Sequence, residues 1–128
     1  MGRRSDREDS SPGDVNWDGP PVDLVHLARH TFGDTELERE VLQLFVAQSH
    51  AYLNRLKEAR DTEQWRRASH TIKGSARGIG AWAVAARAEA AERLGSDVED
   101  TRCREAIIAL EEEIDSANSY IRSLITAH

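Results

Sequence analysis

The last part of the chain carries the pattern that most constrains the fold. Small or apolar residues recur there at alternating spacings of four and three: Cys103, Ile107, Leu110, Ile114, Ala117, Ile121 and Leu124. An α-helix completes a turn in about 3.6 residues, so this spacing places all of them on one face. We predict a long helix from about Val98 to Thr126 that buries this seam, Cys103 included, in an antiparallel helical bundle.

A short amphipathic helix is predicted near the start of the folded part of the chain. Its apolar residues follow two prolines: Val22, Leu24, Val25, Leu27 and Ala28. Gly33 favours an end to this helix, and we expect Phe32, directly before it, to anchor the helix against the bundle.

A much longer helix should follow, because Asp34 or Thr35 can cap its N-terminus and apolar residues recur at helical spacing to about Arg60. Its apolar face is wide enough to touch both the bundle and the short helix. We expect Gln48 to be hydrogen-bonded within that face. The residues expected to face inward are Leu37, Val41, Leu42, Leu44, Phe45, Val46, Gln48, Tyr52, Leu53 and Leu56.

The next predicted helix contains His70. We expect Thr62 to cap it and Trp65 to be its first large core residue. Gly78 and Gly80 should end it, since glycine is typical of the positions that follow a helix.

One more helix is predicted between this one and the C-terminal seam, from about Trp82 to Leu94, with Gly95 stopping it. Small inward residues would let it approach the preceding helix closely: Val84, Ala85, Ala88 and Ala91. The predicted fold class is therefore all-α, an antiparallel up-down four-helix bundle with a short extra N-terminal helix.

The chain is long enough for one domain, at 128 residues. We predict a disordered tail over residues 1–21, which are rich in Arg, Asp, Ser, Gly and Pro and cannot bury enough apolar surface to offset ordering the backbone. The bundle domain is predicted over residues 22–128.

Charge and composition favour a protein partner. The net charge of −6 argues against broad binding to nucleic acid or to anionic membranes. We find no signal peptide and no apolar run that could span a membrane, and the single cysteine is consistent with a reducing compartment. We therefore expect a cytoplasmic protein, and a monomer, since the C-terminal seam is needed for the intramolecular core.

His70 stands opposite the apolar stripe of its helix. At about 100° per residue, the stripe comprises Trp65, Ala68, Ser69, Ile72, Ala76 and Ile79, and the other side comprises Arg66, His70, Lys73, Gly74 and Arg77. The imidazole should face solvent among cations, one turn before a residue that has no side chain. Another protein could then reach the ring with a phosphoryl group, although a helical histidine is more often a plain surface residue.

The run from His70 to Ala81 reads HTIKGSARGIGA. It resembles the signature of the histidine-containing phosphotransfer (HPt) family, in which His-x-x-Lys-Gly is followed by small residues and then Gly-Ala, and the resemblance extends from about Val22 through Leu94. It implies a helical bundle that is no enzyme but relays phosphate between the aspartates of response-regulator receiver domains. The implied partners are such receivers and a sensor histidine kinase.

Glu92 is the candidate for orienting the ring. In a hairpin whose turn centres near Ala81, His70 and Glu92 lie at the same height, because each is eleven positions from Ala81. A carboxylate that accepts a hydrogen bond from Nδ1 fixes the tautomer and leaves Nε2 as the nucleophile. Glu92 could equally be a solvated charge or an ion-pair partner of Arg66.

The resemblance supports this pairing and also leaves a question open. The position 22 residues after the histidine is often Gln in stand-alone members and Glu in the first domain of chemotaxis kinases, and here it is Glu92. The phosphoryl group could therefore come from receivers alone, or also from the ATP-binding domain of a kinase.

Cations near His70 are predicted to meet the phosphoryl group. Lys73, one turn on, is the candidate for neutralising phosphate oxygens. We expect no metal or other cofactor to be bound, because the Mg²⁺ that phosphoryl transfer uses would come from the receiver. Apolar residues of the short helix should assist docking. The residues predicted to contact the partner are Arg66, Gly74, Ser75 and Arg77.

Other interpretations use the same residues. A phosphatase could employ His70 as a base and Glu92 to orient it, although nothing suggests a substrate pocket. A non-catalytic adaptor would bind partners without accepting phosphate. Gly74 could serve close helix packing, and Arg66 and Arg77 could be ordinary surface residues. His26 and His30 could share a metal with Asp23, but no second ligand cluster accompanies them.

Overall fold

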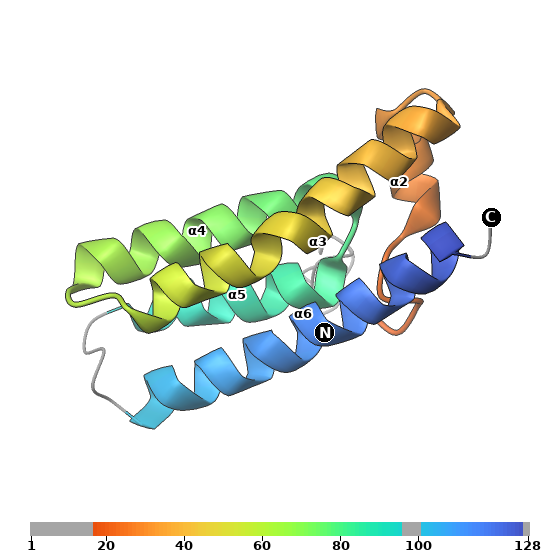
Figure 1. Cartoon of the computed structure of the whole chain (residues 1–128). Coiled ribbons are helices and arrows are strands. Elements are labelled where there is room, and N and C mark those ends of the chain that lie inside the picture. The colour runs from red at the N-terminus through yellow and green to blue at the C-terminus, as the bar shows by residue number, and fades with distance from the viewer. Residues whose placement is uncertain (1–16, 96–100, 127–128) are drawn as a thin grey trace, which may run out of the picture.

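The computed structural model describes residues 17–95 and 101–126, and within them the regular secondary structure is entirely helical. The elements in chain order are α2 (Leu24–His30), α3 (Thr35–Lys57), α4 (Thr62–Ile79), α5 (Trp82–Leu94) and α6 (Thr101–Thr126). Figure 1 shows α3 to α6 running alongside one another in alternating directions, with α2 at one end. The all-α class and the bundle with an extra short helix are thus confirmed.

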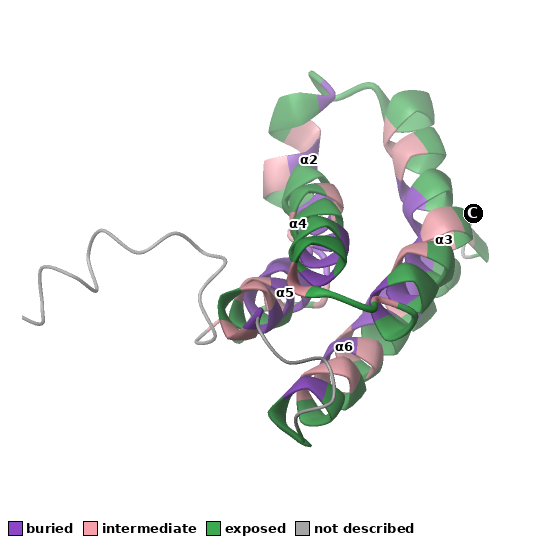
Figure 2. Ribbon diagram, turned by 90° about the vertical axis from the view of Figure 1, so that its left-hand side faces the viewer, coloured by how far each residue is buried: buried purple, intermediate pink, exposed green. Residues whose placement is uncertain are grey.

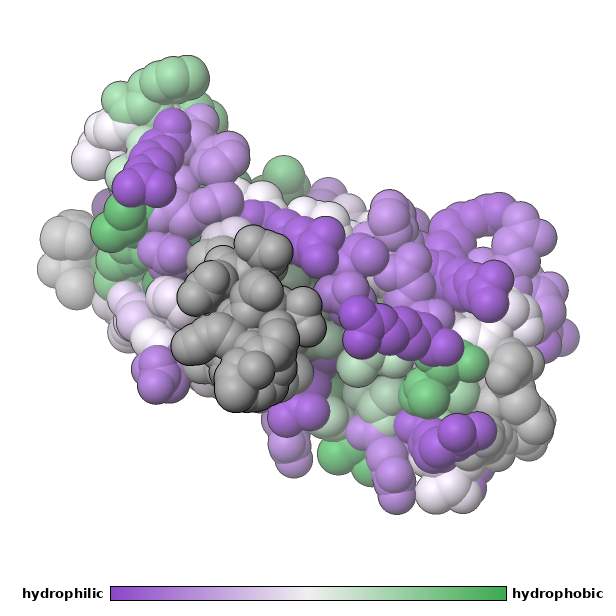
Figure 3. Space-filling view, turned by 180° about the vertical axis from the view of Figure 1, so that it is seen from behind, coloured by the Kyte–Doolittle hydropathy of each residue, from purple (hydrophilic) through white to green (hydrophobic). Residues whose placement is uncertain are grey.

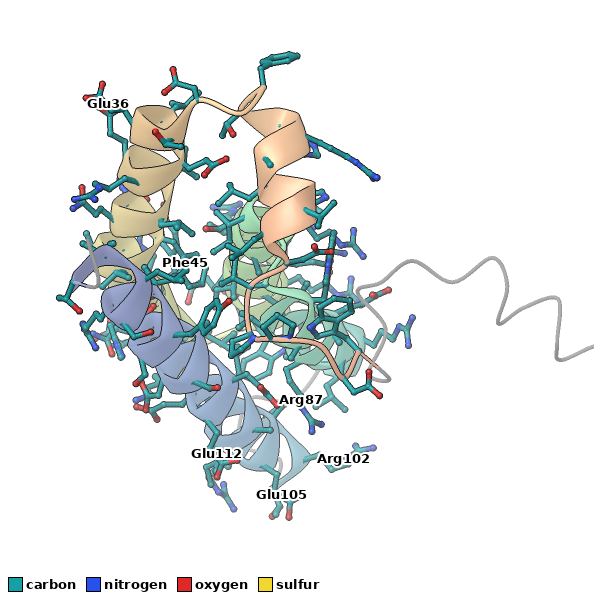
Figure 4. All side chains as sticks on the ribbon, turned by 90° about the vertical axis from the view of Figure 1, so that its right-hand side faces the viewer. Glu36, Phe45, Arg87, Arg102, Glu105 and Glu112 are labelled. Carbon is teal, nitrogen blue, oxygen red and sulfur yellow. The ribbon has the colours of Figure 1, made fainter. Side chains whose placement is uncertain are left out.

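Helices α3 to α6 close around a single core. Each of them packs against two of the others, in the order α3, α4, α5, α6 and back to α3. Their buried faces turn toward one another in Figure 2. Phe45 is one of these core residues, and it points from α3 into the bundle in Figure 4. Five of the seven residues of the predicted C-terminal seam are buried, namely Cys103, Leu110, Ile114, Ala117 and Ile121, and the other two, Ile107 and Leu124, are partly buried.

Side-chain caps and glycines explain where the helices begin and end. Asp34 caps α3 by accepting hydrogen bonds from two backbone N–H groups, as one of the predicted alternatives had it. The cap of α4 is Asp61, whose side chain accepts from the N–H of Gln64, so the prediction of Thr62 was wrong by one residue. The carboxylate outcompetes the neighbouring hydroxyl because it is the stronger acceptor.

The C-terminal ends differ slightly from the prediction. Helix α3 ends at Lys57, a turn before Arg60. Gly80 alone ends α4, with φ at 80°, whereas Gly78 lies inside the helix. A side chain at Gly80 would be strained by that φ, and its Cβ would lie 3.0 Å from atoms of Asp23. Both bounds of α5, Trp82 and Leu94, match the prediction.

The corner between α2 and α3 is more exposed than predicted. Phe32 is 94% exposed with φ at 55°, so it does not anchor the short helix. Leu37 and Leu44 of α3 are exposed as well. The N-terminal half of α3 extends past the ends of α4 and α5, so part of its wide apolar face has no helix to cover it (Figure 1). Hydrophobic surface gathers at this end, at the upper left of Figure 3.

Polar contacts fasten α2 to the junction between α4 and α5. The backbone N–H of Asp23 donates to the Gly80 carbonyl, and the Trp82 indole donates to the Asp23 carboxylate, each at 2.9 Å. His26 Nε2 lies 2.9 Å from the Arg77 carbonyl. Partial burial opposes ionisation of Asp23, but the hydrogen bonds from Trp82 and from the backbone outweigh it and keep its pKa below the ordinary value.

A polar pair lies inside the core between α3 and α6. The Asn118 side-chain amide donates to the Ser49 hydroxyl at 3.0 Å, and both residues are buried. Nearby, the half-buried Gln48 accepts a hydrogen bond from the Tyr52 hydroxyl at 2.7 Å, as was expected of a polar residue on this face. The amide nitrogen of Asn118 is paired in this way, whereas its buried Oδ1 has no hydrogen-bond partner among the described residues.

Two predictions fall partly on residues that the structure leaves undescribed. The tail was predicted over residues 1–21, of which residues 1–16 lie outside the described residues. Within residues 17–21, the Trp17 indole donates to the Pro20 carbonyl at 2.8 Å. The predicted start of the last helix at Val98 also lies outside the described residues.

Candidate functional site

His70 lies in the middle of α4, on the face turned away from the core. The buried residues of that helix are the predicted stripe: Trp65, Ala68, Ser69, Ile72, Ala76 and Ile79. The His70 side chain is 69% exposed. The amphipathic pattern therefore assigned the ring to the correct side of the helix, because α4 buries one narrow stripe against α3 and α5.

Glu92 of α5 bridges two side chains of α4. Its Oε2 lies 3.3 Å from His70 Nδ1, and its Oε1 lies 2.7 Å from Lys73 Nζ. The hairpin geometry thus brings together the three residues that were predicted to share a site. With Nδ1–H donating to the carboxylate, the neutral ring of His70 keeps its lone pair on Nε2.

Lys73 is held more tightly than its position on the helix suggested. Its side chain is only 14% exposed, because the aliphatic stem lies along the bundle while Nζ pairs with Glu92. This ion pair also accounts for the ionisation of Glu92. The hydrogen bond from Lys73 is the main reason that the pKa of Glu92 lies below its ordinary value, with His70 adding a smaller effect and partial burial opposing both.

Acid should loosen this bridge. Because the folded-state pKa of Glu92 is below its ordinary value of 4.5, its interactions stabilise the fold fully above that pH, and the stabilisation is lost as the pH falls through the folded-state pKa. We expect the melting temperature of Glu92→Gln to fall less steeply than that of the wild type between about pH 6 and pH 3. Glu63→Gln, which removes an exposed ion pair with Arg67, is the control. Parallel curves for Glu92→Gln and wild type would contradict this expectation.

Open space surrounds the glycine one turn after His70. A Cβ built on Gly74 would meet nothing within 4 Å, and the same holds for Gly78. Close packing therefore does not require glycine at position 74, which favours access by a partner as its role. Ser75, another predicted contact residue, is half-buried.

The two predicted arginines are engaged differently. Arg66 is exposed and its side chain lies against the end of α5, where a Cβ on Gly95 would come within 2.8 Å of Arg66 Nε. Arg77 Nη2 lies 3.3 Å from Glu89 Oε1. The partners found for Glu92 are His70 and Lys73, so the alternative pairing with Arg66 is not the one observed.

Glu89 and Arg93 of α5 belong to the same face and were not singled out from the sequence. Glu89 Oε2 lies 3.0 Å from Arg93 Nη2, while its other oxygen contacts Arg77. The spacing of Glu89 and Arg93, four residues apart, is typical of a helical ion pair and was the available signal. Glu89, Glu92 and Arg93 share one face of α5 because they are three and four residues apart.

The described residues hold no group of three or more His, Cys, Asp or Glu side chains that could bind a metal ion. The ring nitrogens of the His26 and His30 pair are instead directed at carbonyl groups, of Arg77 and His26 respectively. Over the described ranges, no helix is both long and apolar enough to cross a membrane.

The family model described as the Hpt domain matches residues 40–120, which is more than half of the chain and includes α4 and α5 with all the residues around His70. None of the curated proteins and none of the solved structures matches the chain.

Proposed function

The chain belongs to the Hpt domain family and so has a phosphotransfer role in two-component signalling, and we propose that His70 is the residue that carries the phosphoryl group. In this proposal His70 accepts phosphate from the aspartate of a receiver domain, or from a sensor kinase, and passes it to another receiver. The protein then acts as a carrier that turns over no metabolite, and it works as a cytoplasmic monomer.

The observation that carries this proposal is the environment of the His70 ring. It is exposed to an incoming protein on one side, and on the other a carboxylate lies 3.3 Å from Nδ1. A phosphatase would need a pocket that excludes water and holds a small substrate, whereas this ring stands open on a helix face. An exposed, oriented imidazole is what transfer between two proteins requires.

This geometry supports a direct transfer step. Nε2 of His70 attacks phosphorus while the bond between phosphorus and the receiver's carboxylate oxygen breaks, and that electron pair stays on the aspartate. The ring gains positive charge as the new bond forms, and the Glu92 carboxylate beside Nδ1–H stabilises it. Lys73, which already neutralises Glu92, is proposed to turn one of its N–H groups toward the phosphate oxygens. The Mg²⁺ for the reaction is proposed to come with the receiver.

Loading with phosphate tests the assignment. The full chain is incubated with a phosphorylated receiver, and the modified residue is located by mass spectrometry. We expect one acid-labile, alkali-stable phosphate on His70, as befits a bond from nitrogen to phosphorus. An acid-stable phosphate on a hydroxyl group would refute the proposal. So would steady release of inorganic phosphate from a small phosphomonoester, which indicates a phosphatase, or tight receiver binding without transfer, which indicates an adaptor.

The partner is proposed to dock over Gly74 and the exposed apolar residues of α2, Leu24 and Val25. Gly74→Gln should therefore separate stability from transfer. Replacing a glycine inside an exposed helix should stabilise the fold by roughly 0.5 kcal/mol. The new side chain should nevertheless obstruct the partner and lower the initial transfer rate on the order of tenfold, a cost of about 1.4 kcal/mol.

Gly78→Gln is the matched control, because its Cβ position is equally open and it lies a further turn from His70. Urea denaturation of Gly78→Gln should show the same gain in unfolding free energy. Its initial transfer rate should fall less than that of Gly74→Gln. Equal rates for Gly74→Gln and wild type would show that the gap at position 74 does not serve docking.

A further inference from the structure

On the side of the bundle that carries His70, two carboxylates of α5 each contact two basic side chains. Glu92 contacts His70 and Lys73, and Glu89 contacts Arg77 and Arg93. Both carboxylates are partly buried, so they fix the positions of the groups around them. The proposed chemistry accounts for the set around Glu92. In the set around Glu89, Arg77 is a predicted partner contact, but Glu89 and Arg93 have no role yet.

The basic side chains of these two sets differ in how far they are exposed to solvent. The Lys73 side chain is 14% exposed, whereas those of Arg77 and Arg93 are 45% and 76% exposed. A docked protein can therefore reach the two arginines more readily than the lysine. Each guanidinium has five N–H donors, and its contact with Glu89 is through Nη2, so further donors remain for an external acceptor.

The position of the arginines suits a contact beside the reacting group. Arg77 is seven residues after His70, which places it about 10 Å along the same face of α4. Arg93 directly follows Glu92, whose carboxylate touches the ring. With two guanidiniums around one carboxylate, this set carries net positive charge, although the chain as a whole is negative.

We propose that Arg77 and Arg93, held together by Glu89, bind acidic side chains of the receiver domain next to its phosphorylated aspartate. This inference rests on the proposed function. The receiver must be acidic there, because the accepting residue is itself an aspartate and the Mg²⁺ used in phosphoryl transfer is held by carboxylates. Guanidiniums pair with carboxylates through two parallel hydrogen bonds, so the arginines give orientation as well as attraction.

The test is the dependence of transfer on receiver concentration and salt. Charges at the edge of an interface act mainly on the association rate and on its salt dependence. In Arg77→Ala/Arg93→Ala, we expect the half-saturating concentration of phosphorylated receiver to rise on the order of tenfold at low salt. The maximal rate should change less than twofold, since the reacting groups are untouched. The difference from wild type should shrink as salt is added.

Arg87→Ala is the matched control. Its side chain is 47% exposed and pairs across to Glu113 of α6, so it resembles Arg77 in exposure and pairing but lies on another side of α5. Figure 4 shows Arg87 beside α6. It should leave the half-saturating concentration unchanged, and Arg77→Lys/Arg93→Lys should restore part of the loss because charge is kept but paired hydrogen bonds are not.

The proposal is overturned if the double alanine variant matches wild type in half-saturating concentration and in salt dependence, or if Arg87→Ala has the same effect. A lower maximal rate with unchanged half-saturation would also overturn it. In each case phosphate still loads onto His70, so the proposed function survives. Failure of wild-type His70 to load would instead remove the proposed function, and this inference with it.

Discussion

Replacing His70 by Gln should abolish phosphoryl loading while leaving the bundle folded. Glutamine is similar to histidine in size and polarity. Its amide nitrogen has no available lone pair, so the variant lacks the nucleophile. The expected loss is on the order of 10³-fold or more, as for removal of a nucleophile from an enzyme. Because the ring is 69% exposed, the unfolding free energy should change by less than about 1 kcal/mol. Phosphate incorporation and urea denaturation measure the two effects.

His50→Gln provides the same substitution at another exposed histidine. His50 lies on α3 and pairs with Asp115 of α6, away from the α4 and α5 face. It should load phosphate at the wild-type rate. Loading of His70→Gln to the wild-type level would show that another residue accepts the group.

Trp65→Ala should be the most damaging single change to the fold. Trp65 is 1% exposed, and its indole donates a 2.6 Å hydrogen bond to the Ala91 carbonyl of α5. Removing it opens a cavity and leaves that carbonyl without its indole donor, which costs about 3–5 kcal/mol. A domain of this size has roughly 5–15 kcal/mol in total, so the variant should lose a large share of its unfolding free energy, which urea denaturation measures.

Trp65→Phe separates the two contributions. It retains most of the ring volume and loses the hydrogen bond, so the loss of unfolding free energy should be smaller than for alanine, roughly 1–3 kcal/mol. Because Trp65 joins the two helices that hold His70 and Glu92, loading should also slow in Trp65→Phe. A cost below about 1 kcal/mol for Trp65→Ala would show that this contact does not hold α4 to α5.

Helical periodicity was sufficient where one stripe of a helix is buried. For α4 it identified every buried residue and the exposed side of His70. For α5, both ends were predicted correctly from the glycines that flank the helix, Gly80 and Gly95. Counting outward from Ala81 placed Glu92 opposite His70 because the two helices form a tight antiparallel hairpin, in which distance from the turn determines height.

The same reasoning failed where tertiary packing decides the outcome. The apolar face of α3 is wider than its neighbours can cover, and periodicity could not tell that Leu37 and Leu44 would be the residues left exposed. Phe32 has a hydrophobic side chain but lies in a corner that turns it outward. Lys73 was assigned to the exposed side, but its long side chain bends back to an acid on another helix, a contact that the spacing within α4 cannot reveal.

The buried contact between Asn118 and Ser49 limits how α6 can align with α3. A repeating seam of small and apolar residues would pack almost as well after sliding by seven residues, since the same kinds of side chain would meet again. Sliding would bury an amide against hydrocarbon, at a cost of roughly 1–3 kcal/mol. One amide and one hydroxyl thus select a single alignment of the two longest helices, and the stable frame on which α4 and α5 rest depends on that choice.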